Sequence, residues 1–97
     1  MMSEGFDSQI ENGSHKHDEQ NLYQVIVFNN DFNTVDEVSK IIQRAVCCSI
    51  EVAEHITWVI HNEGKAIAMI APYAMAKKAA GVICTIGIKV IVSKVKS

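Results

Sequence analysis

Four hydrogen-bonding side chains, in two short stretches, are the residues of this sequence best suited to chemistry. Asn29, Asn30 and Asp31 follow one another, and His61 lies further along the chain. Amide oxygens, a carboxylate and a neutral imidazole nitrogen all accept hydrogen bonds. Such a cluster of acceptors could bind an ammonium group. The more common explanations are that the triplet forms a turn and that a histidine at a helix end interacts with the helix dipole.

Apolar side chains near these positions could form a hydrophobic hole beside the acceptors. The candidates are Val35, Val38, Ile60 and, if the last strand packs there, Ile91. Acceptors beside an apolar hole would suit an amino-terminal residue with a bulky side chain. The residue types alone do not decide between this site and an ordinary turn.

A cysteine nucleophile and a metal site are both less well supported. Cys47 and Cys48 are expected at the end of a helix, whereas a thiolate is favoured at a helix start. His15 and His17 lie in a polar segment expected to be flexible, where a chance pair of histidines is more common than a metal site. We therefore expect no enzymatic activity, no cofactor and no metal. A small enzyme that uses a cysteine with His61 is the least favoured alternative.

Length and composition predict one small domain. The chain has 97 residues and a net charge of -2, which gives no indication of nucleic-acid binding. No stretch is long enough to span a membrane, and the N-terminus resembles neither a secretory signal nor a transit peptide. The three cysteines have no metal-binding spacing and are expected to be reduced thiols. We expect a cytoplasmic monomer without nucleic-acid or membrane partners.

The charged residues are unevenly distributed along the chain. The first twenty residues carry Lys16 against five acids, which are Glu4, Asp7, Glu11, Asp18 and Glu19. No acid follows Glu63, whereas six lysines do. Solvated surface is the usual explanation for such asymmetry, and a docking face for an acidic partner is the alternative.

Hydrophobic periodicity predicts the elements that would position these residues. Residues 1–21 are polar and are expected to form a flexible extension, followed by one domain over residues 22–97. The sequence predicts strands over 23–28, 65–70 and 88–92, and helices over 34–46, 49–64 and 72–87. The order β-α-α-β-α-β predicts an α+β domain in which a small three-stranded antiparallel sheet packs against three helices.

Local signals mark the ends of the expected helices. Thr34 and Glu37 match a capping box. Ser49 is expected to cap the second helix, and Gly64 to end it in the left-handed conformation. Pro72 fits the first turn of the third helix.

Two blocks of sequence carry a family resemblance: residues 23–34 (YQVIVFNNDFNT) and residues 59–66 (VIHNEGKA). The first resembles the opening strand and Asn-Asp-Asp turn of the ClpS family, and the second resembles that family's junction between helix two and strand two. The separation of the blocks and the order of elements fit as well. The resemblance covers roughly residues 22–95.

The resemblance implies a non-catalytic adaptor. ClpS-like proteins bind N-degrons, which are proteins that begin with Leu, Phe, Tyr or Trp. They deliver these proteins to a Clp AAA+ unfoldase by docking on its N-terminal domain, and the N-terminal extension takes part in delivery. The family's ligands for the α-amine match Asn29, Asn30 and His61, with Asp31 as a candidate fourth. Its hydrophobic pocket would correspond to Val35, Val38, Thr57, Ile60 and Ile91.

Two positions depart from the family pattern. Asn30 stands where the family has Asp, and a neutral bond to an ammonium is weaker by about 1–2 kcal/mol, or about 5- to 30-fold in affinity. Val35 stands where the family often has Met, and its shorter side chain would reshape the pocket mouth. Asn30 favours an alternative function, a ClpS-like modulator that docks on the unfoldase without recognising N-degrons. An unrelated α+β binding domain is a further alternative.

Overall fold

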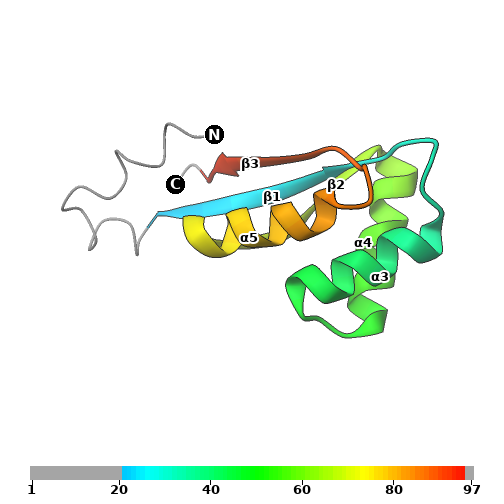
Figure 1. The fold of residues 1–97 in the computed structure, drawn as a ribbon, viewed down its shortest axis with the longest axis horizontal. Coiled ribbons are helices and arrows are strands. Elements are labelled where there is room, and N and C mark those ends of the chain that lie inside the picture. Colours follow the sequence, from blue (N-terminus) through cyan, green and yellow to red (C-terminus); the bar gives the residue numbers. More distant parts are fainter. Residues whose placement is uncertain (1–20, 96–97) are drawn as a thin grey trace.

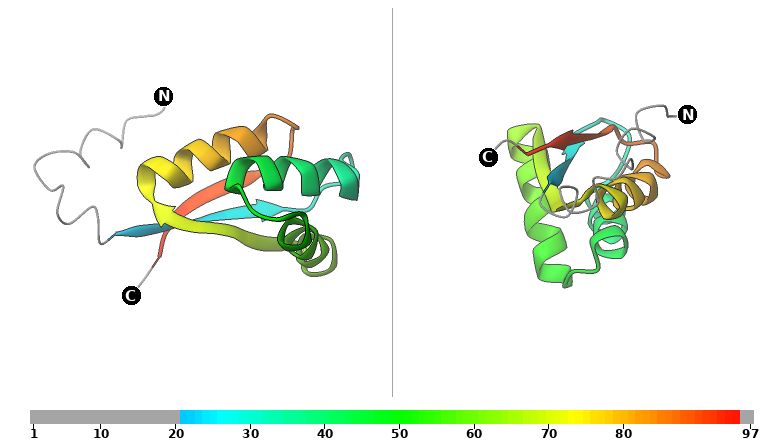
Figure 2. Two further views of the ribbon diagram at one scale, coloured as in Figure 1. Left: turned by 90° about the horizontal axis from the view of Figure 1, so that it is seen from below. Right: turned by 90° about the vertical axis from the view of Figure 1, so that its left-hand side faces the viewer.

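The computed structural model describes residues 21–95, which form three strands and three helices in the expected order (Figure 1). The elements are β1 (Leu22–Phe28), α3 (Val35–Val46), α4 (Ile50–Glu63), β2 (Lys65–Pro72), α5 (Tyr73–Cys84) and β3 (Val90–Lys94). The extension expected over residues 1–21 lies outside the described residues except for Asn21, so it stays a prediction. Figures 1 and 2 show α5 running along the sheet, with α3 and α4 together at one end.

The sheet is antiparallel throughout and has the order β2-β1-β3, which confirms the expected fold class. Val25 and Val27 alternate along the central strand β1, and both are fully buried against the helices. The pairing of β1 with β2 shifts register between Val25 and Ile26. The strands therefore bury one face and leave an outer face that carries the row Ile67, Ile26 and Ile91.

The three helices cover the buried face of the sheet and complete the core. Ile42 of α3, Ile60 of α4 and Ile83 of α5 are among the largest fully buried side chains, together with the two β1 valines. Each helix thus contributes a large aliphatic side chain to one cluster. This shared cluster fixes α3 and α4 relative to the end of β1, where the candidate acceptors begin.

The expected helix caps are confirmed. The Glu37 backbone N–H donates to Thr34 Oγ1 at 3.1 Å, and the Thr34 backbone N–H donates to Glu37 Oε1 at 2.9 Å. The Ser49 hydroxyl accepts from the backbone of Val52. Gly64 ends α4 with φ 92°, a conformation in which a side chain would be strained.

The expected boundaries of the last two elements were wrong by a few residues. Pro72 is the final residue of β2 and precedes α5 in an extended conformation, with ψ 157°. Proline is tolerated there because β2 is an edge strand, and the backbone N–H groups on the outer side of an edge strand need no partner strand. Strand β3 begins at Val90, two residues later than expected, because Ile88 is buried in the core and follows a left-handed turn at Gly87 (φ 86°).

Candidate functional site

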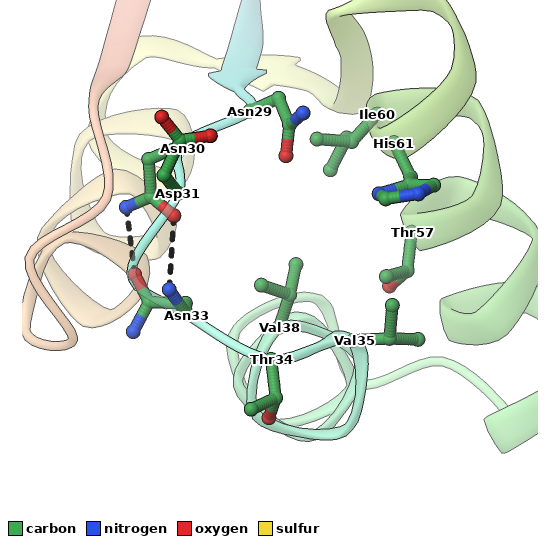
Figure 3. A pocket seen from close by; sticks show the side chains of 10 residues that line it. All are labelled: Asn29, Asn30, Asp31, Asn33, Thr34, Val35, Val38, Thr57, Ile60 and His61. Atoms are coloured by element: carbon green, nitrogen blue, oxygen red, sulfur yellow. Dashed lines mark hydrogen bonds between the residues drawn. The ribbon is translucent and has the colours of Figure 1, made fainter.

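A pocket of about 340 Å3 opens between the β1–α3 turn, the first turn of α3 and one side of α4 (Figure 3). All of the site residues expected from the sequence line it, except Ile91. The lining residues are Asn29, Asn30, Asp31, Asn33, Thr34, Val35, Val38, Thr57, Ile60 and His61. The fold therefore brings the acceptor triplet, the histidine and the apolar candidates into one hollow.

Ile91 lies on a different part of the molecule. It pairs with Ile26 on the outer face of the sheet and is 38% exposed. The expectation that it lines the pocket required β3 to pack beside α4. In the observed strand order α4 packs against β2, and β3 occupies the opposite edge.

The Asn30 side chain is bound within its own turn. Its Oδ1 accepts from the backbone N–H groups of Phe32 at 3.2 Å and Asn33 at 3.1 Å. Its Nδ2 donates to Asn33 Oδ1 at 2.8 Å, and Figure 3 shows the amide turned toward Asn33. Asn30 therefore shapes the wall of the pocket by forming an Asx-type turn.

Asn33, which the sequence reasoning missed, fixes the orientation of the Asn30 amide. Its Nδ2 donates to the carbonyl oxygen of Ile86 at 3.0 Å and to Glu37 Oε1 at 3.3 Å. Because a carbonyl can only accept, the nitrogen of Asn33 must face Ile86 and its oxygen must face Asn30. Residue 30 consequently needs a donor there, which Asn supplies and an ionised Asp does not. The available signals for Asn33 were its place in the block of residues 23–34 that carries the resemblance and its position directly before the capping box.

Asn29 and His61 lie on facing sides of the pocket (Figure 3). The Asn29 backbone N–H donates to the Gly64 carbonyl oxygen at 2.9 Å, which ties the end of β1 to the end of α4. This bond brings the last turn of α4, and with it His61, opposite Asn29. Within residues 21–95 neither side chain hydrogen-bonds to another described residue, so both retain their capacity to bind a ligand.

The deeper wall of the pocket is apolar and belongs to the hydrophobic core. Val38 is buried, as are Thr57 and Ile60 at 2% exposure each. The Thr57 hydroxyl donates to the Ala53 carbonyl oxygen at 2.7 Å, so its hydrogen is already used within α4. Val35 stands at the mouth, where it is 55% exposed.

The electrostatic character of the pocket comes from Asp31. It is the acidic member of the lining set, and no lysine or arginine is among the described residues that line the pocket. Asp31 follows the bound Asn30 amide in the turn, and its carboxylate is exposed. Asp31 lines the same pocket as Asn29 and His61.

Comparison with protein families gives a match over residues 18–86 to the family described as "ATP-dependent Clp protease adaptor protein ClpS". The chain belongs to the ClpS family. Membership confirms the resemblance that residues 23–34 and 59–66 carry, and it makes this ClpS-family chain an adaptor of the Clp protease system. No protein of curated function was found to match the chain.

A solved structure with the same fold supports the assignment of architecture. ClpS2 of Agrobacterium tumefaciens, solved bound to L-phenylalaninamide, superposes with a TM-score of 0.72. The match covers 77% of this chain and 98% of that chain at 16% sequence identity. The ClpS fold is therefore retained although most side chains differ.

The residues considered for a cysteine nucleophile or a metal site do not line this pocket. Cys47, Cys48 and Cys84 are free thiols, and none of them lines the pocket that contains His61. Residues 21–95 contain no group of three potential metal ligands, and His15 and His17 lie outside that range. None of the three described helices is long and apolar enough to cross a membrane.

Proposed function

We propose that this protein binds the amino termini of proteins that begin with a bulky hydrophobic residue and delivers them to a Clp AAA+ unfoldase. One observation carries the proposal. Unoccupied acceptors on Asn29 and His61, with the Asp31 carboxylate nearby, lie above an apolar floor in a single pocket. An α-amino group needs hydrogen-bond acceptors, and the bulky side chain next to it needs an apolar surface.

The polar rim suits an ammonium group. An ammonium has three hydrogens to donate, and Asn29, Asp31 and His61 offer an amide oxygen, a carboxylate oxygen and a ring nitrogen. The carboxylate adds a charge-assisted bond, which is about twice as strong as a neutral one. Asn30 contributes indirectly, since both ends of its amide hold the turn that carries its two neighbours.

The apolar floor suits the first side chain of the substrate. A volume of about 340 Å3 is at the small end for ligand pockets and is enough for one bulky residue. Val38, Thr57 and Ile60 would remove that side chain from water, which favours binding by about 25 cal/mol per Å2 of apolar surface. The phenylalaninamide bound to the Agrobacterium ClpS2 combines a free amine with an aromatic side chain, as this proposal requires.

Delivery rests on family membership. The proposed partner is the N-terminal domain of the unfoldase, with the adaptor acting as a monomer. The second candidate function is modulation of the unfoldase by docking without N-degron recognition. The bound state of the Asn30 amide favours it, because the oxygen of the residue that matches the family's Asp already accepts two hydrogen bonds and has no lone pair left for an amine.

The test is fluorescence anisotropy with labelled peptides that begin with Leu, Phe, Tyr or Trp. We expect binding that requires both a free amine and a bulky first residue, so acetylated and Met-first peptides should fail. His61→Ala and Asn29→Ala should each abolish binding. Asn62→Ala is the matched control, since Asn62 adjoins His61 but bonds to the Trp58 carbonyl outside the pocket. An unfoldase that binds the protein while every peptide fails would establish the second candidate.

A further inference from the structure

The face of the sheet that points away from the core is largely apolar and partly exposed. Ile67 of β2 and Ile91 of β3 pair with Ile26 on either side of the central strand, and they are 48% and 38% exposed. Leu22 and Ile70 extend this surface and are 40% and 52% exposed. We call the following residues the outer sheet face: Leu22, Ile26, Phe28, Ile67, Ile70 and Ile91. An exposed surface of adjoining apolar side chains commonly marks a binding site.

Two lysines flank the Phe28 end of the outer sheet face. Lys65 is the register partner of Phe28 on β2, and the Phe28 backbone N–H donates to the Lys89 carbonyl oxygen at 3.0 Å on the other side. The two ammonium nitrogens lie 5.8 Å and 5.0 Å from the centre of the Phe28 ring. The strands β1, β2 and β3 contain no Asp or Glu. The outer sheet face therefore suits a segment that is both apolar and acidic.

The N-terminal part of the chain has this composition. Residues 1–20 contain five acids and one lysine. Phe6 and Ile10 are four positions apart, a spacing that places both side chains on one side of the segment whether it is helical or extended. Asp7 and Glu11 directly follow them. The segment thus offers two apolar side chains with a carboxylate beside each.

Reach and area favour this segment over a second copy of the chain. Strand β1 has seven residues and is about 23 Å long. The ten residues between Ile10 and Asn21 can span about 35 Å, so Ile10 can return along the whole sheet. Three strands about 4.8 Å apart give a face of roughly 250 Å2, whereas a stable complex buries about 800 Å2 of each partner. A segment joined to the sheet needs less contact, because its effective concentration is about millimolar.

We infer that residues 4–11 bind across the outer sheet face of their own chain. Phe6 and Ile10 then pack on the isoleucine row, and the acidic side chains approach Lys65 and Lys89. The inference goes beyond the proposed function and does not depend on peptide binding by the pocket. It also gives the uneven charge of the sequence a role within one molecule. A partner that uses the N-terminal segment or the outer sheet face must first displace this contact.

The experiment records isoleucine methyl NMR spectra of the native full chain and of the double variant Phe6→Ala/Ile10→Ala in low salt. The signals of Ile67 and Ile91 should move in the variant, because the Phe6 ring leaves their surroundings. The methyl signals of the fully buried Ile42 and Ile83 should stay in place and report an intact core.

The matched control is Phe32→Ala, which removes a phenylalanine that is 88% exposed in the turn between β1 and α3. It should leave the signals of Ile67 and Ile91 where they are. Signals of Ile67 and Ile91 that are the same in the native chain and in Phe6→Ala/Ile10→Ala would overturn the inference.

Lysine variants test the electrostatic part of the contact. Lys65→Gln/Lys89→Gln should lower the ratio of bound to released segment by about 2- to 10-fold, read from the position of the Ile67 signal between its two limits. Salt at about 0.5 M should act in the same direction, because exposed charges are screened. Lys77→Gln/Lys78→Gln removes the same two charges from exposed positions of α5 and should have little effect. Equal ratios in the two lysine variants would overturn the inference.

A mixture of isotope-labelled and unlabelled chains identifies the occupant of the outer sheet face. We expect nuclear Overhauser effects between the Phe6 ring and the methyl groups of Ile67 or Ile91 within one molecule, with signal positions that do not depend on protein concentration. Effects that arise only between molecules would show that a second copy supplies the segment, and would overturn the inference.

Discussion

The two walls of the pocket are held in place by different interactions. The turn wall, Asn29–Thr34, is largely exposed and is organised by hydrogen bonds from the Asn30 and Asn33 side chains. The helix wall, formed by Val38, Thr57 and Ile60, is buried and is organised by packing in the core. A substitution in the turn wall can therefore alter amine binding with a limited cost in stability, whereas one in the helix wall alters the core as well.

This difference suggests which property of such a pocket can change easily. In the proposed function, recognition of the amine would depend on exposed residues of the turn wall that support one another over a few positions. Recognition of the first side chain would depend on residues that also stabilise the whole domain. Val35 is the exception on the apolar side, since it lines the pocket and remains 55% exposed.

The largest effect is expected in the helix wall. Ile60→Ala removes a side chain that is 2% exposed and serves both the core and the pocket floor. The free energy of unfolding should fall by about 2–4 kcal/mol, through lost burial and the cavity left behind. Urea denaturation measures this loss, and Val35→Ala, at the exposed mouth of the same pocket, should cost less than about 0.5 kcal/mol. Comparable losses in the two variants would contradict the separation of core from rim.

A smaller effect is expected in the turn wall. Asn30→Asp replaces the amide nitrogen that donates to Asn33 Oδ1 by an oxygen, so two acceptors would face each other. Unfolding free energy should fall by about 1 kcal/mol, the size of one hydrogen bond. Peptide affinity should not improve, because the other oxygen remains bound to the Phe32 and Asn33 backbone. A variant of unchanged stability that binds peptides more tightly would make residue 30 a direct ligand of the amine.

The role of Asn30 shows where sequence reasoning reaches its limit. The sequence identified it as a polar residue in a turn, and the family pattern suggested that it contacts the amine. Its actual partners depend on Asn33, whose orientation is set by Ile86, fifty-three positions further along the chain. Residue types can be read locally, but the direction of an amide depends on such distant contacts.

The elements were easier to predict because their signals are local. The capping box of Thr34 and Glu37 and the left-handed glycine at position 64 fixed the ends of α3 and α4 to within a residue or two. Ile91 and the start of β3 were placed wrongly for a different reason. An apolar residue near the C-terminus can pair in a strand or fill the core, and only the strand order decides which.

The smallest effect on stability is expected at Val35, which lines the apolar side of the pocket but is exposed. Val35→Met places a longer, flexible side chain at the mouth, where the family often has Met. Because Val35 is exposed, stability should change by less than about 0.5 kcal/mol. The narrower mouth should disfavour Phe-first and Trp-first peptides relative to Leu-first peptides by about 5-fold. This is the lower end of the about 1–3 kcal/mol that one methylene is worth in a hydrophobic pocket, because the mouth is exposed. Competition anisotropy with the three peptides measures this ratio in the native and variant proteins. An unchanged ratio would mean that the buried floor alone selects the first side chain, and that the exposed rim serves only the amine and the residues that follow it.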